Sequence, residues 1–207
     1  KPVKTVWSRE DDMRGGYYRP FSLSRVQAGV DAQGMPVAIH HTIVGKGVLA
    51  HSGLAKLVVK DGIDPSSVEG AANMVYAVAN HRVEVHNTEE IVPILWWRSG
   101  GNSINGFVTN TLIDELAVLG RKDPVELRRA LLAGSPRHLA VLEKVVGESH
   151  YGKVKLPHGH FHGVALLESF GSVVAQVAEV SVTGKEVRVH RVTCAVDCGL
   201  VINPDQV

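Results

Sequence analysis

The sequence has little of several features that point directly to a function. It holds two cysteines among 207 residues and no Cys-x-x-Cys pair, which argues against a disulfide-stapled scaffold or a cysteine metal knuckle. The 22 Lys and Arg nearly balance the 21 Asp and Glu, leaving a formal charge of +1. No net field therefore favours nucleic acid or an anionic membrane. No apolar run approaches the roughly 20 residues of a membrane span, and no signal-peptide pattern opens the chain.

Familiar catalytic motifs are also missing. The chain contains no G-x-S-x-G elbow, no H-E-x-x-H and no G-x-G-x-x-G or Walker spacing. It begins at Lys1 within the strand-like stretch KPVKTVW and stops at VINPDQV, with neither a terminal helix nor a polar tail. We therefore expect a piece of a longer polypeptide.

Hydrophobic residues make up 44% of the chain, enough for a sizeable core. β-Branched and apolar runs predict strands at 2–7, 23–32, 35–44 and within 75–97, with a hairpin loop at DAQG. SREDDM offers a Ser or Asp cap for a short helical turn, and the Gly-rich 45–73 is expected to be loop with a short helix.

After Gly101 the apolar spacing becomes helical, with Ser103 as an expected cap. Asp123-Pro124 and Ser135-Pro136 predict helices over 124–133 and 136–147. Strand patterns return at 163–171, 173–182 and 186–196. Strands, then helices, then strands indicate an α+β fold, with a subdomain boundary near YGKVKLPHG that divides the chain into 1–152 and 153–207.

The stretch ILWWRSGGNSINGF is the strongest local candidate for a site. Gly100 and Gly101 allow positive φ and close approach, the following helix points free N–H groups at the same place, and Arg98 adds a cation. Such a turn suits a phosphate, a pyrophosphate or a metal-oxo group. The alternative is a strand-to-helix corner in which Arg98 pairs with a carboxylate.

Two other patterns favour structural interpretations. His158, His160 and His162 alternate and would share one side of an extended segment, but no distant ligand is evident, so a partly exposed strand is expected. Cys194 and Cys198 are expected to be buried thiols packed in a sheet, without a redox role.

Three stretches of the chain, in their order and spacing, resemble the molybdenum-binding subunit of the xanthine dehydrogenase family. They are PVKTVWSREDDMRGGYYRP, the segment from WWRSGGNSINGF to RRALL, and GHFHGVALLESFGSVVAQVAEVSV with VRVHRVTCAVDCGLVINPDQV. The likeness is to the isoquinoline 1-oxidoreductase β-subunit and to membrane-associated aldehyde dehydrogenases. It covers nearly the whole chain.

The resemblance implies an oxidoreductase that hydroxylates an N-heterocycle or an aldehyde with oxygen from water. It implies a molybdopterin dinucleotide carrying molybdenum, a [2Fe-2S] small subunit as partner, and a cytochrome as a further electron acceptor. It also assigns 1–152 to a first molybdenum-cofactor-binding subdomain and 153–207 to the beginning of a second. A bacterial periplasmic, inner-membrane-associated or cytoplasmic location is compatible with it.

The family's cofactor loop falls on Arg98, Ser99, Gly100 and Gly101. Xanthine-type members carry a substrate-sandwiching aromatic where this chain has Gly100, so a different substrate pocket is implied. The family's Gly-Gly-x-Phe-Gly loop is expected before Lys1, and its Gln-Gly segment and catalytic glutamate after Val207. We assign no catalytic residue and no metal ligand within the chain, and expect it to be inactive and to bind no cofactor tightly on its own.

Two alternatives remain at this point. The same α+β unit could be a non-catalytic module that docks an iron–sulfur partner, with the Gly-Gly turn as a simple corner. It could also be a phosphate-ligand-binding domain without molybdenum.

Overall fold

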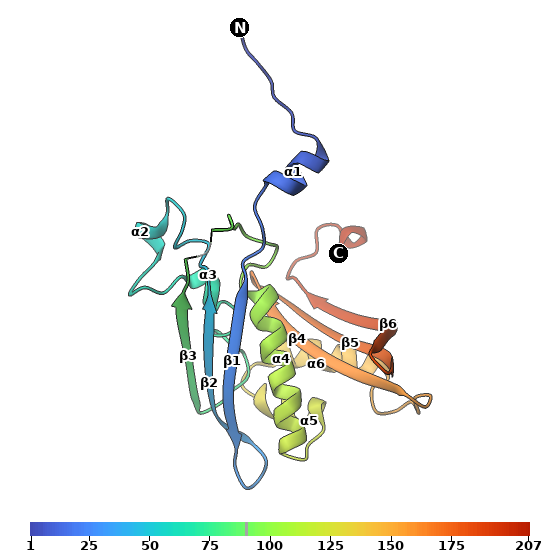
Figure 1. Cartoon of the computed structure of the whole chain (residues 1–207). Coiled ribbons are helices and arrows are strands. Elements are labelled where there is room, and N and C mark those ends of the chain that lie inside the picture. Colours follow the sequence, from blue (N-terminus) through green and yellow to red (C-terminus); the bar gives the residue numbers. More distant parts are fainter. Residues whose placement is uncertain (90) are drawn as a thin grey trace.

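The structure, a computed structural model, describes residues 1–89 and 91–207 and arranges two three-stranded sheets around helices (Figure 1). In chain order the elements are α1 Arg9–Gly15, β1 Ser22–Val30, β2 Pro36–Gly45, α2 Ala55–Val58, α3 Pro65–Val68, β3 Asn80–Asn87, α4 Asn102–Leu119, α5 Pro124–Leu131, α6 Pro136–Ser149, β4 His160–Ser169, β5 Ser172–Thr183, β6 Glu186–Asp197 and the 3-10 turn Pro204–Gln206. The α+β class is confirmed. None of the described helices is both long and apolar enough to cross a bilayer.

The first sheet has the order β1-β2-β3, with β1 and β2 antiparallel and β2 and β3 parallel. The predicted hairpin is present, and its turn is fixed by Asp31, whose Oδ1 accepts the N–H groups of Gln33 and Met35. Gly34 has φ +76°, and a Cβ there would collide with the carbonyl of Gly120 at the end of α4. The hairpin tip therefore packs directly against the helix.

Local signals set the starts of α5 and α6. Asp123 Oδ1 accepts the N–H groups of Val125 and Glu126, and Pro124 occupies the first helical position. Ser135 precedes Pro136 in the same way but makes no capping hydrogen bond with its side chain. Both helices lie where the sequence predicts them, within two residues at each end.

The second sheet is an antiparallel meander, β4-β5-β6, and α6 packs on its β5 and β6 strands. Arg137 at the start of α6 pairs with Asp197 at the end of β6, with Nε 2.9 Å from Oδ2. Helix α4 contacts β1 in the first sheet and β4 in the second, so it lies between them (Figure 1).

Among the described residues, one hydrophobic core cluster joins the two halves of the chain. It includes Ile113 of α4, Leu142 of α6 and Val173 of β5, all fully buried. These residues stand on both sides of the predicted boundary at 152 and 153, whose two subdomains are thus packed together. The division itself stays a prediction.

Two local predictions were wrong, and a third, the strand within 75–97, was met only in part. Residues 2–7 form no strand, because they extend from the body and pair with no other segment. Within 75–97 a strand covers only β3, and Ile94 makes an isolated bridge to Tyr18; the part of this prediction at residue 90 lies outside the described residues. The cysteines are not buried: Cys194 is exposed on the sheet face opposite α6, and Cys198 follows the end of β6.

Candidate functional site: the Arg98–Gly101 loop and the groove beside α4

The Arg98–Gly101 loop turns sharply into α4. Ser99 and Gly100 both adopt left-handed backbone conformations, with φ of +68° and +53°, and Gly100 donates its N–H to the carbonyl of Trp97 at 3.1 Å. Gly101 is the N-cap residue of α4, and because it is a glycine the helix start has no capping hydrogen bond from the side chain of its N-cap residue. The predicted cap Ser103 acts differently, since its Oγ donates to the Gly100 carbonyl at 2.9 Å.

Among the described residues, the anion bonded to this turn is the chain's own Glu69. Its Oε2 accepts the N–H of Gly101 at 3.2 Å, in the position where the end of a helix favours negative charge. The turn therefore binds a carboxylate of the chain itself, and its binding of an external anion stays a prediction. The structure shows that a side chain 32 residues earlier in the sequence uses it.

The two glycines are required by the segment behind the loop. A Cβ on Gly100 would lie 2.5 Å from Oε2 of Glu69, and one on Gly101 would collide with the carbonyl of Ser66. Both contacts lie on the inner side of the loop. The absence of a side chain at these two positions therefore lets the loop backbone pack closely against α3 and Glu69.

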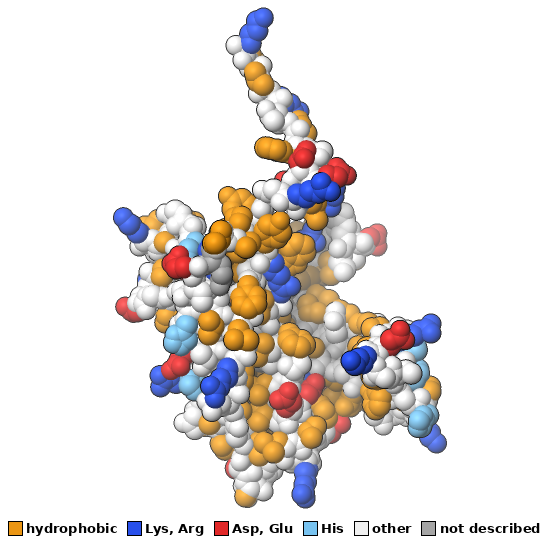
Figure 2. All heavy atoms as spheres, in the orientation of Figure 1, with side chains coloured by type: hydrophobic (Ala, Val, Ile, Leu, Met, Phe, Trp, Pro, Cys, Tyr) orange, Lys and Arg blue, Asp and Glu red, His pale blue; other side chains and the backbone are white. Residues whose placement is uncertain are grey.

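The outer side of the loop is open. Arg98 is exposed, and its side chain makes no hydrogen bond or ion pair within the described part of the chain. Ser99 is one of the residues that line a groove of about 690 Å³ between α4 and the second sheet. Mostly small and apolar groups line it, among them Gly106, Phe107, Ala165, Leu167 and Val174. Figure 2 shows this face hollowed beside α4, with hydrophobic side chains around the hollow.

Asn102, the first residue of α4, also lines the groove. It is 5% exposed, and its Oδ1 has no hydrogen-bond partner among the described residues. A buried carbonyl oxygen without a donor is costly. This oxygen lies on the inner side of the loop, where a Cβ on Gly70 would be 2.8 Å from it.

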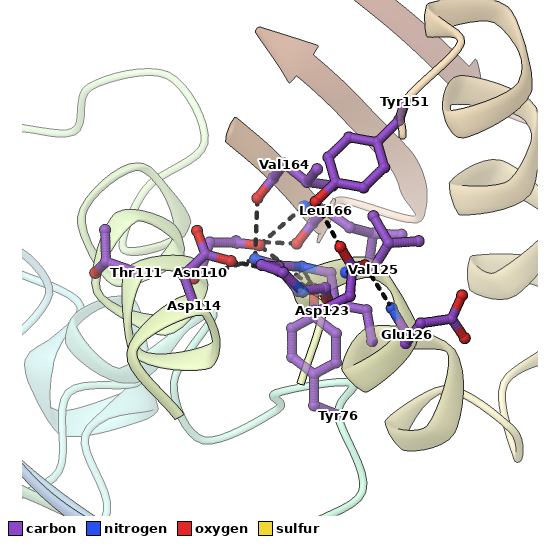
Figure 3. A network of polar contacts seen from close by, with 12 residues as sticks. Tyr76, Asn110, Thr111, Asp114, Asp123, Val125, Glu126, Tyr151, Val164 and Leu166 are labelled. Carbon is purple, nitrogen blue, oxygen red and sulfur yellow. Dashed lines mark hydrogen bonds and ion pairs between the residues drawn. The ribbon is translucent and has the colours of Figure 1, made fainter. Parts of the chain in front are cut away.

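A buried polar network fixes α4 to β4 behind the groove (Figure 3). The side chain of Asn110 donates to the Leu166 carbonyl at 3.0 Å and accepts the Leu166 N–H at 2.9 Å. Arg128 donates to the carbonyls of Asn110 and Val164 and, through Nε, to the hydroxyl of Tyr76. Burial raises the pKa of Tyr76, although Arg128 opposes the shift. The groove therefore has a rigid wall.

Glu69 has a perturbed ionisation. Burial raises the pKa of Glu69, the Gly101 N–H opposes the shift, and the negative charge of Asp64 adds to it. Asp64 is fully buried and holds the N–H groups of Ser66 and Ala50. Two carboxylates thus lie close to the inner side of the loop.

The other sequence candidates lie elsewhere. His160 and His162 are on β4, as expected for a partly exposed strand, and His158 lies in the turn before it. His160 bonds Glu179 at 2.7 Å and stacks on His190. Within residues 1–89 and 91–207 no group of three or more His, Cys, Asp or Glu side chains is arranged to hold a metal ion.

Sequence reasoning named the Arg98–Gly101 loop as a candidate, which stays a prediction, and it did not name Glu69 or Asn102. Glu69 carried no signal, since a single carboxylate before a glycine is common, and its contact with Gly101 depends on the fold. Asn102 was hidden among the polar residues at the start of a helix. An unusual number of Asn residues on the buried side of α4, Asn102, Asn105 and Asn110, was the available hint.

Comparison with known proteins defines the class. Residues 1–132 match the family of molybdopterin cofactor-binding domains, and the chain belongs to that family. This confirms the resemblance to molybdenum-binding subunits and agrees with the predicted cofactor.

Individual relatives are consistent with this class. The isoquinoline 1-oxidoreductase subunit beta of Brevundimonas diminuta is 31% identical over 210 residues, covering 99% of this chain and 27% of the relative. The membrane-bound aldehyde dehydrogenase (pyrroloquinoline-quinone) of Gluconacetobacter polyoxogenes is 27% identical over 232 residues, covering 99% of this chain and 30% of the relative. The chain spans less than a third of either relative.

Two solved structures are similar. The aldehyde oxidoreductase from Desulfovibrio desulfuricans ATCC 27774 has a TM-score of 0.50 and 19% identity, covering 76% of this chain and 18% of that one. The aldehyde oxidoreductase from Desulfovibrio gigas has a TM-score of 0.48 and 18% identity, covering 89% and 22%. The first likeness supports the fold.

Proposed function

We propose that this chain forms part of the cofactor-binding portion of a molybdenum hydroxylase subunit. The complete enzyme would hydroxylate an N-heterocycle or an aldehyde with water as the source of oxygen. Membership of the molybdopterin cofactor-binding family, together with the names of the two curated relatives, supports the proposal. Residues 1–152 would belong to a first cofactor-binding subdomain and 153–207 to the beginning of a second.

The residues at the loop fit a pterin dinucleotide. The exposed guanidinium of Arg98 suits an anionic pyrophosphate or metal-oxo group, and its neighbour Ser99 lines the groove beside α4. The match of residues 1–132 to the molybdopterin cofactor-binding family is the observation on which the proposal mainly depends. When bound, the molybdenum centre would supply two-electron oxidation and water activation.

The chain's own contribution is binding and orientation. Arg98 and Ser99 would contact the cofactor from the outer side of the loop, and Gly100 and Gly101 give the loop its shape. The Gly101 N–H is already bonded to Glu69. Gly101 would therefore shape the loop through its backbone conformation and would not bind the cofactor with this N–H. The proposal assigns no catalytic base to the described residues.

Electrons would leave through a [2Fe-2S] small subunit, with a cytochrome as further acceptor. The relative named as a subunit beta is part of a multi-subunit protein, which supports a partner. The near-neutral charge of the chain gives no support for nucleic acid as a partner.

Molybdenum content tests the proposal. The complete subunit, produced with its partner, should contain molybdenum, and Arg98→Ala should reduce the metal content about tenfold, because a charge-assisted contact is lost. Arg188→Ala, which removes an exposed cation from β6, is the matched control and should leave the content unchanged. A subunit without molybdenum, or an Arg98→Ala variant equal to the control, would refute the assignment.

A further inference from the structure

The segment from Asp64 to Gly70 forms the inner wall of the loop. Asp64 caps α3, accepting the N–H of Ser66 at 2.8 Å and its hydroxyl at 2.6 Å. The other oxygen of Asp64 accepts the N–H of Ala50 at 2.8 Å. These bonds fix the short turn that carries Glu69.

Helix α4 holds this wall from the other side. The side-chain amide of Asn105 donates to the carbonyls of Ser67 and Glu69, at 3.0 and 2.8 Å. Thr109 donates its hydroxyl to the carbonyl of Gly70 at 3.1 Å. The backbone around Glu69 is therefore hydrogen-bonded to two successive turns of α4. The Glu69 carboxylate itself bonds to Gly101, the residue just before the helix.

We propose that Glu69 is the positioning residue of the Arg98–Gly101 loop: its carboxylate, held against α4, fixes the backbone of Gly101 so that Arg98 and Ser99 face outward. The part of this inference that concerns the cofactor rests on the proposed function.

The donors of the loop support this role. The N–H of Gly100 bonds to Trp97, that of Gly101 to Glu69, and that of Asn102 to the Ser99 carbonyl at 3.0 Å. These three N–H groups are used within the chain. A ligand would meet the side chains of Arg98 and Ser99, and their direction depends on the backbone that Glu69 holds.

The chemistry of Glu69 suits the task. Its carboxylate lies at the positive end of an 18-residue helix, and it occupies the space that a side chain at position 100 would need. A side chain with one acceptor oxygen at the same reach is sufficient for the bond to Gly101. A shorter side chain is not.

The test compares four variants of the complete subunit. Glu69→Ala removes the acceptor, Glu69→Asp shortens it, and Glu69→Gln keeps an acceptor oxygen without the charge. Glu115→Ala, which removes an exposed carboxylate from α4, is the control. The readouts are hydrogen–deuterium exchange of peptides covering 98–105 and the molybdenum content.

Glu69→Ala and Glu69→Asp should speed exchange at Gly101 about tenfold, since one hydrogen bond to a charged group is lost, and should lower the metal content in parallel. Glu69→Gln should restore both to within about twofold of the unaltered protein. Unchanged exchange in Glu69→Ala, or a Glu69→Gln variant as impaired as Glu69→Ala, would overturn the positioning role.

The two proposals fail in different ways. If Glu69→Ala speeds exchange while molybdenum stays unchanged in both Glu69→Ala and Arg98→Ala, Glu69 sets the loop but the loop does not hold the cofactor. That result removes the proposed site and the cofactor part of this inference together. The exchange measurement alone decides the positioning role.

Discussion

Arg128 Nη1 lies 2.6 Å from Asp114 Oδ1, and this ion pair joins α5 to α4 beneath the groove. The Arg128 side chain is fully buried, whereas that of Asp114 is 40% exposed. The remaining guanidinium donors reach the Tyr76 hydroxyl and the carbonyls of Asn110, Pro124 and Val164. A single cation thus connects two helices, a loop and a strand of the second sheet (Figure 3).

Removing this cation should strongly destabilise the fold. Arg128→Ala leaves several buried carbonyls without donors and should lower the free energy of unfolding by about 3–5 kcal/mol. Arg128→Lys keeps the charge but not the planar fork, so it should recover only part of the loss. Urea unfolding measures both changes.

The matched control is Arg129→Ala on the same helix. Arg129 pairs with Glu126 and Glu143 at the surface, where ion pairs contribute about 0–1 kcal/mol. If Arg128→Lys were as stable as the unaltered protein, the fork of hydrogen bonds would not be the important feature.

Asn110 should be similarly specific. Its amide bonds the backbone of Leu166 in both directions, so Asn110→Asp keeps the acceptor but replaces the donor with an oxygen that faces the Leu166 carbonyl. We expect a loss of about 1–3 kcal/mol in unfolding free energy near neutral pH. Thr111→Ala, whose hydroxyl bonds only back to its own helix, should change it far less. Equal effects of the two substitutions would contradict the bridge between α4 and β4.

Much of the fold could be predicted because its signals are local. Asp123-Pro124 and Ser135-Pro136 mark helix starts, and the DAQG turn places the first hairpin. The predictions failed where a segment needed a partner. Residues 2–7 have strand composition but no strand beside them, and Cys194 lies on the sheet face that α6 leaves uncovered.

The candidate site could be predicted only in part, for the same reason. Arg98 to Gly101 stand next to each other, so their residue types indicate an anion-binding turn. The carboxylate that occupies its inner side comes from Glu69, which only the packing of α3 against α4 brings near. The unpartnered oxygen of Asn102 is likewise a property of the folded chain.

The close packing behind the loop predicts opposite effects for two Gly→Ala substitutions in or beside helices. Gly101→Ala places a methyl group against the Ser66 carbonyl and should destabilise by about 1–3 kcal/mol. Gly147→Ala in α6 meets open space and should stabilise by about 0.5–1 kcal/mol, because alanine loses less backbone entropy. Thermal unfolding of both variants measures the contrast. If Gly101→Ala left the stability unchanged, the segment around Ser66 would be able to move away from the added methyl group at little cost.

Glu69 should give stability an unusual pH dependence. Burial raises the pKa of Glu69 above its ordinary 4.5, so the folded protein keeps this proton to a higher pH than the unfolded chain does. As pH rises from the ordinary to the raised pKa, the unfolded state has released the proton and the folded state still binds it. The free energy of unfolding then falls with rising pH.

Glu69→Gln has no such titration, so it isolates the effect. Urea unfolding of both proteins from about pH 4 to about pH 8 should show that the unaltered protein loses stability relative to Glu69→Gln as pH rises from 4.5 to the raised pKa of Glu69, and that the difference then becomes constant. A difference that changes in the opposite direction would mean that the Gly101 N–H and the end of α4 outweigh burial. The pKa of Glu69 would then be lowered, and the carboxylate would hold the loop most firmly in its charged form.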